Sequence, residues 1–167
     1  MAHHIDEIDA EILRLLQARG RMKRNAIAKK VDLSVSAVSE RMRKLEERGV
    51  ITGYHAVVDA KRLHLDITAF IRVSVDGSEH YDEFVERVTT MDQVLEAHSI
   101  TGEGSHILKV RIRNTTALER LLAKIQALPG VSTTTSSIVL STFKETRAIR
   151  AEPMELYDYE EYTVTTD

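Results

Sequence analysis

Residues 24–49 of the chain read RNAIAKKVDLSVSAVSERMRKLEERG. The stretch predicts two short helices, at about residues 24–30 and 34–48, because apolar side chains recur in each at helical spacing. A tight turn at Asp32-Leu33 separates them, and Gly49 ends the second helix. The side of the second helix that faces a core is expected to consist of Val35, Val38, Met42 and Leu45.

The opposite side of the second helix is slim, polar and basic. Its small side chains would let the helix approach base edges closely in a major groove about 12 Å wide. Residues 19–48 contain ten Lys or Arg and four Asp or Glu, although the whole chain carries a net charge of −3. Salt screens charges beyond about 10 Å at 0.1 M, so a local basic surface can still bind phosphate. We therefore predict a helix-turn-helix that binds double-stranded DNA through Lys23, Arg24, Ser34, Ser36, Ala37, Ser39, Glu40, Arg41, Arg43 and Lys44.

A plain three-helix bundle with a solvated basic face is the alternative to DNA binding. Glu40, Glu46 and Glu47 favour it mildly, although they can pair with basic side chains at helical spacing. The positive excess is confined to residues 19–48 and lies beside the serine-rich start of the second helix. This distribution favours the DNA-binding interpretation.

The flanking segments complete an N-terminal domain. A first helix is predicted at residues 6–19, with Asp6 as its N-cap. After Gly49 the pattern becomes extended, and residues 50–58 are predicted to form a short strand and wing. Because a polar connector follows, we place a winged helix-turn-helix DNA-binding domain at residues 1–62.

Residues 63–144 alternate between strand and helix patterns in the order βαββαβ. This order predicts an α+β fold whose second domain is a ferredoxin-like sandwich, with both helices on one face of the sheet. The other face would be exposed in a single copy, so we expect a homo-oligomer to bury it. The predicted strands are residues 67–75, 94–100, 106–113 and 131–144, and the predicted helices are about residues 81–91 and 118–128.

The remaining residues, 145–167, form an acidic C-terminal tail with seven Asp or Glu. We expect it to be solvated, while the tyrosines within Tyr157–Tyr162 leave docking onto a neighbouring subunit open. The absence of cysteine excludes disulfides and thiolate metal sites. No apolar run approaches the roughly 18 residues of a membrane span, and the start lacks a secretory signal pattern. These features fit a cytoplasmic protein.

Several segments of the chain, in their order and spacing, resemble the leucine-responsive/asparagine-synthesis regulator (Lrp/AsnC) family. The resemblance covers residues 6–144 and is most specific over residues 38–54, VSERMRKLEERGVITGY. Weaker segments that support it are DEID at residues 6–9, IAKKVDLS at 27–34, Thr101-Gly102, LPGV at 128–131 and Ile138-Val139-Leu140.

The resemblance implies a transcription regulator controlled by a small-molecule effector, often an amino acid. It also implies dimers that assemble into tetramers or octamers, with the effector bound between dimers. By position, the effector would lie against the turn of Gly102, Glu103, Gly104 and Ser105, and the opposing wall would be Thr133, Thr134, Thr135 and Ser136. The domain at residues 63–144 would therefore bind the effector and form the oligomer.

The chain departs from the family pattern at two places. The family usually has Asp-Tyr where this chain has Ser105-His106, which removes a carboxylate partner for the ammonium group of an amino acid. The family also commonly has glycine in the connector where His64 stands, which alters the expected hinge between the domains.

An enzyme on the same architecture is the alternative function. Some enzymes that resemble this family decarboxylate a tetrapyrrole, and His98, His106, Arg111 and Arg113 are the residues that such a site would use. An intact basic helix would have no purpose in that enzyme, so we expect none. His98 and His106 flank the turn and are able to share one face of the sheet, but two histidines without a third ligand make a poor metal site. We expect no cofactor.

Overall fold

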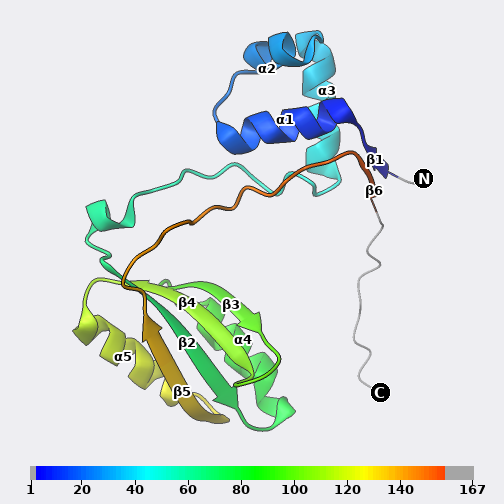
Figure 1. The fold of residues 1–167 in the computed structure, drawn as a ribbon. Helices are drawn as coiled ribbons and strands as arrows, with labels where there is room; N and C mark the ends of the chain where they lie inside the picture. The colour runs from blue at the N-terminus through cyan, green and yellow to red at the C-terminus, as the bar shows by residue number, and fades with distance from the viewer. Residues whose placement is uncertain (1–2, 157–167) are drawn as a thin grey trace. The chain divides into compact units, whose positions relative to one another are not determined.

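The computed structural model describes residues 3–156 of the chain (Figure 1). The described residues fall into two compact units, one made of residues 3–57 with 146–156 and the other of residues 58–145. The boundary between Val57 and Val58 precedes the expected one at residue 62, and the described part of the acidic segment belongs to the first unit. Between residues 3 and 156, no helix is both long enough and apolar enough to cross a membrane.

Three helices form the first unit: α1 (Glu7–Ala18), α2 (Arg24–Val31) and α3 (Val35–Glu47). Helix α1 begins at a capping box, in which the Asp6 carboxylate accepts a hydrogen bond of 2.8 Å from the Asp9 N–H. Helices this short depend on tertiary packing, and each fully buried aliphatic side chain contributes about 1.5–3 kcal/mol. Their shared core contains Ile12, Leu13, Leu15, Leu16, Ile27, Ala28, Val38, Met42 and Leu45.

A tight turn joins α2 to α3 at the predicted position. Asp32 ends α2 in the left-handed conformation, with φ of 53°, and its N–H donates to the Ala28 carbonyl. The Leu33 N–H donates to the same carbonyl at 3.0 Å. Ser34 then caps α3, because its hydroxyl accepts a hydrogen bond from the Ala37 N–H at 3.1 Å. The short turn thereby fixes where α3 starts relative to α2.

The short strand predicted at residues 50–58 does not form. This segment contains neither strand nor helix, and the side chain of Val57 is 102% exposed. A strand requires a partner that accepts its ladder of hydrogen bonds. Among residues 3–156 no strand pairs with this segment, so the alternation in the sequence is not expressed as a strand.

The side chains of residues 145–154 are exposed apart from that of Ala151, as a solvated tail predicts, but the described segment is also attached to the first unit at a few points. The Gln17 side-chain amide donates to the Ile149 carbonyl at 2.9 Å and accepts from the Ile149 N–H at 2.7 Å. Ala151 packs against the helical core, and β6 (Met154–Leu156) pairs antiparallel with β1 (His3–Ile5). These contacts provide hydrogen-bond partners for part of the extended backbone. The acidic composition of the segment gives no sign of them. The tyrosines of Tyr157–Tyr162 lie outside the described residues.

The second unit has the predicted βαββαβ order and ferredoxin-like topology. Its antiparallel sheet has the strand order β3-β4-β2-β5. Alternate residues of β2, including Ala69, Ile71 and Val73, are buried beneath Phe84 and Ile125 of the two helices. Helices α4 and α5 cover this one face of the sheet (Figure 1). The elements are β2 (Ile67–Val75), α4 (Tyr81–Thr89), β3 (Val94–Ser99), β4 (His106–Ile112), α5 (Thr115–Gln126) and β5 (Val131–Ile138).

Strand β5 ends at Ile138, before the predicted end at residue 144. It lies at the edge of the sheet and pairs only with β2, whose first residues, Ile67 and Thr68, mark the end of the available ladder. One further hydrogen bond joins the Val139 N–H to the Thr68 carbonyl at 2.9 Å. Among residues 3–156 no strand lies beside the chain beyond this point, so it leaves the sheet.

His64 occupies a backbone position that favours glycine. It follows a short 3-10 turn at Ala60–Leu63 and has φ of 58°, in the left-handed region. The Lrp/AsnC resemblance implies glycine at this position, and the backbone retains the conformation that glycine would adopt most readily.

Asp32→Val tests the turn between α2 and α3. A β-branched residue in the left-handed region is expected to lower the free energy of unfolding by about 1–2 kcal/mol. Asp32→Asn, which tolerates that conformation, is the matched control and should change stability little. Urea unfolding followed by helical circular dichroism measures both variants, and equal stability for Asp32→Val would contradict the assigned turn geometry.

Candidate nucleic-acid interface and effector cavity

Helix α3 has one buried side and one free side. Val38, Met42 and Leu45 are buried in the core, as predicted. On the opposite side, Ser36 and Glu40 are exposed. Ala37 and Ser39 are half-buried at the edges of that side, and Ser34 is exposed at the N-cap. The front of the helix is therefore narrow and polar, as a groove-binding helix requires.

Val35 was expected in the core but is 46% exposed at the first turn of α3. The apolar spacing of α3 therefore extends one position beyond the side chains that the core buries. An exposed branched side chain at the start of this helix is suited to contact the methyl group of thymine. Sequence reasoning missed Val35 as a candidate contact because its spacing matches that of the core residues.

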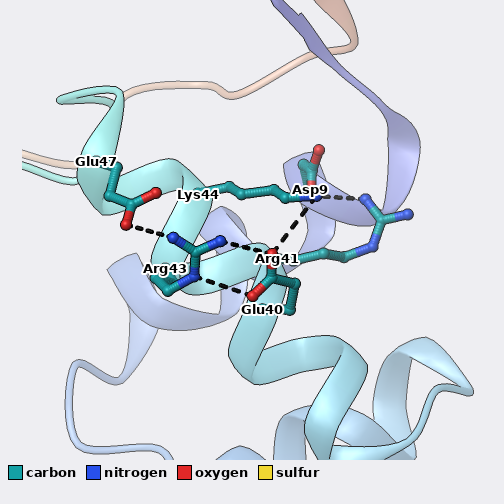
Figure 2. A network of polar contacts seen from close by, with 6 residues as sticks. All are labelled: Asp9, Glu40, Arg41, Arg43, Lys44 and Glu47. Carbon is teal, nitrogen blue, oxygen red and sulfur yellow. Dashed lines mark hydrogen bonds and ion pairs between the residues drawn. The ribbon is translucent and has the colours of Figure 1, made fainter.

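Charged side chains on the free side of α3 form one network of ion pairs. The Arg43 guanidinium donates to both Glu40 carboxylate oxygens, at 2.9 and 2.7 Å, and also to Glu47. The Lys44 Nζ lies 3.6 Å from Glu40. Figure 2 shows Arg43 between the two carboxylates. Glu40 first and then Glu47 raise the pKa of Arg43, and Arg43 lowers the pKa of Glu40, so this ion pair is charged at neutral pH.

Arg41 points away from this network and toward α1. Its Nη1 donates to Asp6 at 2.7 Å and to Asp9 at 2.8 Å, as Figure 2 shows for Asp9. The Arg41 side chain is only 29% exposed. The hydrogen bond with Asp9 is the largest cause that raises the pKa of Arg41. This geometry argues against the predicted DNA contact of Arg41.

Lys23 and Arg24, the other predicted basic contacts, are exposed at the start of α2. Nearby in the fold, the Tyr54 hydroxyl donates to the Glu46 carboxylate at 2.8 Å. Burial, followed by the contact with Glu46, raises the pKa of Tyr54 to about 12. Tyr54 thus attaches the chain after α3 to the C-terminal half of that helix.

A cavity of about 380 Å³ lies at the predicted effector turn of the second unit. Gly102, Gly104 and Ser105 line it, whereas the predicted Glu103 does not. Thr133, Thr134, Thr135 and Ser136 belong to β5 and are likewise not part of the lining within one chain. Five lining residues had not been predicted, namely Ser74, Val75, Tyr81, Ser99 and Ile100.

Ser74 and Val75 reach the cavity through the register of the sheet, Tyr81 reaches it from the start of α4, and Ser99 and Ile100 come directly before the turn. Val73 of β2 pairs with His106 of β4, and the Ser105 N–H donates to the Val73 carbonyl at 2.9 Å. This pairing brings the end of β2 beside the turn between β3 and β4. No local sequence pattern indicates that Ser74 lies at the cavity, because the strand order and the register must both be known before Ser74 can be placed there.

Ser105 and His106 connect the cavity to the core. The Val75 N–H donates to the Ser105 hydroxyl at 3.0 Å, and that hydroxyl lies 2.9 Å from His106 Nδ1. His106 is buried, and its ring lies 5.1 Å from the ring of Tyr81. Burial lowers the pKa of His106, and its Nε2 has no hydrogen-bond partner among residues 3–156.

The residues proposed for an enzyme site are divided between the two faces of the sheet. His98 was expected to be able to share a face with His106, but Ser99 pairs with His106 and His98 pairs with Ile107, so the two histidines lie on opposite faces of the sheet. The Arg111 guanidinium instead donates a hydrogen bond from Nη2 to Glu145 Oε2 at 3.1 Å. Within the described part of the chain, no three His, Asp or Glu side chains are grouped to hold a metal ion.

Two sequence families match the chain. A model described as "Winged helix-turn-helix DNA-binding" matches residues 5–52, and one described as "Lrp/AsnC ligand binding domain" matches residues 68–149. Together they cover both units of the structure. The predicted fold class is thereby confirmed.

Curated relatives cover most of the chain. The HTH-type transcriptional regulator FL11 of Pyrococcus horikoshii is 36% identical over 142 residues, which are 85% of this chain and 93% of FL11. The HTH-type transcriptional regulator LrpA of Mycobacterium tuberculosis is 35% identical over 147 residues, which are 88% of this chain and 97% of LrpA. These identities extend through both units.

Solved structures are similar over the same length. A transcriptional regulator of Neisseria meningitidis in complex with L-Met has a TM-score of 0.83 at 29% identity, and the match covers 87% of this chain and 96% of that chain. The feast or famine regulatory protein of M. tuberculosis complexed with L-methionine has a TM-score of 0.82 at 35% identity, with 87% and 99% covered.

The lowered pKa of His106 predicts a pH-dependent stability. In the unfolded chain His106 is protonated near the ordinary histidine pKa of 6.5, whereas in the folded chain it is protonated only at a lower pH. The free energy of unfolding should therefore be highest above pH 6.5 and fall as the pH drops below it, until the lowered folded pKa is passed. Urea unfolding between pH 5 and 8 measures this dependence.

His106→Gln should flatten the pH dependence, while His98→Gln serves as the control because His98 is exposed on the other face. A wild-type slope retained in His106→Gln would show that other groups cause the effect.

Proposed function

The chain belongs to the Lrp/AsnC family of DNA-binding transcription regulators, and from that premise we propose that α3 is its recognition helix and the cavity at the β3–β4 turn its effector site. The observation that carries the first assignment is the division of α3 into a buried apolar side and a free, narrow, polar side. A helix of this kind fits the major groove, where donors and acceptors distinguish all four base pairs.

Base contacts are proposed for the first half of α3. Ser36 and Ser39 offer short hydroxyls, Val35 offers a methyl surface, and Glu40 is able to accept from cytosine N4. Ser34 and the free N–H groups of the first turn suit a backbone phosphate. Lys23 and Arg24 are placed to bind phosphate from α2, where they fix the register of the helix on the duplex.

The ion-pair network limits how strongly α3 attracts DNA of any sequence. Glu40 and Glu47 balance the charges of Arg43 and Lys44, so these four side chains have no net charge. Non-specific affinity derives from phosphate contacts by cations. We infer that Arg43 is held ready for a base or phosphate while the carboxylates suppress binding to unrelated sequences.

An amino acid or a related metabolite is the proposed effector. Two relatives of known structure are named as complexes with L-methionine. The cavity has the size of a small-molecule site and offers the hydroxyls of Ser74, Ser99 and Ser105. None of its lining side chains is a carboxylate, so recognition of an ammonium group would rely on hydroxyls, carbonyls or a second copy of the chain.

A homo-oligomer is proposed because apolar side chains of the second unit face solvent in one copy. Phe143 is 98% exposed, and Phe70, Ile138 and Leu140 are exposed as well. Assembly would cover this surface, and another copy would supply Thr133–Ser136 as the opposing wall of the effector site. Two recognition helices in a dimer would enter successive major grooves about 34 Å apart.

Effector control then follows from differential binding. An effector that binds between copies favours the assembly in which its site is complete, and its effect is limited by its relative affinity for the alternative assemblies. A change of assembly alters the spacing of the recognition helices, which DNA must match.

The relatives are transcription regulators, which gives the enzyme alternative no support. A regulator must reach the chromosome, and we propose a cytoplasmic location.

Selection of a duplex from a randomised pool tests the DNA-binding assignment. The purified chain should enrich a defined sequence, and its retention of that sequence in mobility-shift gels should weaken steeply with salt. Retention of all duplexes alike, or of none, would contradict the assignment of α3 as a recognition helix.

Arg43→Ala should weaken binding to the selected duplex by about tenfold or more, because it removes a cation and leaves Lys44 alone to balance Glu40 and Glu47. Size-exclusion chromatography should show an unchanged oligomer. Arg14→Ala is the matched control, since Arg14 forms an exposed ion pair with Glu11 on α1. Equal affinities for the two variants at moderate salt would remove Arg43 from the interface.

Gly102→Asp should abolish the response to the effector while DNA affinity is retained. Gly102 has φ of 98° and nothing within 4 Å of an added Cβ, so the aspartate would enter open space beside the cavity. Thermal-shift titration with L-methionine and other amino acids at fixed protein concentration measures the response. Gly102→Asn separates backbone strain from charge, and an undiminished response in both variants would exclude the turn from the site.

A further inference from the structure

Arg41 lies on α3 but is bound entirely by the start of α1. Its Nη1 is shared between the Asp6 carboxylate at 2.7 Å and the Asp9 carboxylate at 2.8 Å. Asp6 is the N-cap of α1 and Asp9 is the third residue of the helix, so both acceptors belong to the capping box. A single guanidinium therefore joins the middle of α3 to the first turn of α1.

We propose that Arg41 is a positioning residue, which sets the angle and register of α3 on the helical core and thereby the sequence discrimination of the protein. The inference rests on the proposed role of α3 as recognition helix. It assigns Arg41 a role that is distinct from contact with DNA.

This contact is buried at Asp9, while the side chains of Arg41 and Asp6 are partly exposed. Asp9 is 8% exposed, and its carboxylate lies against both the Asp6 N–H and Arg41. Burial would raise the pKa of Asp6, but the hydrogen bond from Asp9 N–H and the contact with Arg41 outweigh it and lower that pKa. The Asp6 carboxylate is thus held ionised beside the Arg41 cation, and a charged hydrogen bond in a partly buried site has narrow geometric freedom.

Loss of Arg41 would leave two carboxylates facing each other without a cation. Their repulsion would push the first turn of α1 away from its present position, and Ile5, which precedes that turn, is buried in the same core. The apolar contacts of Val38, Met42 and Leu45 would still hold α3 on the core, but they are non-directional. The helix would remain folded and lose a fixed orientation.

Orientation matters most for base contacts. A base-edge hydrogen bond requires a side chain at a defined distance and angle, whereas long phosphate-binding side chains such as Lys23 and Arg24 adjust to small shifts. A direct phosphate contact by Arg41 is the competing role, and it would require Arg41 to leave both Asp6 and Asp9. The two roles predict different dependences on sequence and salt.

Arg41→Ala is compared with the wild-type chain on two probes, a duplex selected by the wild type and the same duplex with its sequence scrambled. The positioning role predicts that affinity for the selected duplex falls by about tenfold, the discrimination of one base contact. Affinity for the scrambled duplex should stay constant, and so should the slope of log affinity against log salt. Circular dichroism confirms that the variant is folded at the assay temperature.

Three other patterns would overturn the proposal. A loss on both duplexes with a salt slope reduced by about one would identify Arg41 as a phosphate ligand. An equal loss on both duplexes with an unchanged slope would mean only that fewer molecules are folded. Unchanged binding to both would show that Arg41 is dispensable. If the wild type selects no duplex, the recognition-helix proposal itself fails.

Asp9→Asn keeps the shape of the partner and removes its charge. Because Asp9 is buried in α1, it should reproduce the loss of discrimination without any contact with DNA. Arg41→Lys retains the cation and should restore part of the discrimination. The matched control is again Arg14→Ala, whose ion pair stays within α1. Full discrimination in Asp9→Asn would contradict the link between the capping box and α3.

Discussion

The proposed function depends on the way α3 is divided between core and solvent. Val38, Met42 and Leu45 fill the helical core, and burial of such side chains is the main force that holds a 13-residue helix in place. Because that packing uses only one side, the opposite side is free for a duplex. The turn at Asp32 and the ion pairs of Arg41 then fix how the free side is presented.

Most of the fold could be predicted because its local signals agree with its packing. The alternation in β2 and the helical spacing in α1 and α3 each match the face that is buried. The differences in the strands and in the C-terminal segment share one cause, which is dependence on a distant partner. Residues 50–58 alternate but have no strand to pair with, β5 ends where β2 ends, and the C-terminal segment is held by Gln17 and β1.

The candidate sites were predictable to different degrees. The serines of α3 and the glycines of the effector turn stand out locally, since small residues and turn residues mark close approach. Ser74 reaches the cavity through strand register and Tyr81 through the packing of α4 on the sheet, and no local pattern specifies either. Arg41 shows the limit most clearly. Its neighbours in sequence suggest a basic surface, whereas its partners, Asp6 and Asp9, lie more than thirty residues away.

Methylation interference on a duplex selected by the protein tests the central claim most directly. Dimethyl sulfate modifies guanine N7 in the major groove and adenine N3 in the minor groove. If the free side of α3 reads the major groove from a dimer, guanine N7 methylation should block binding in two clusters one helical turn apart. Interference confined to adenine N3, or absent from both grooves, would contradict the account.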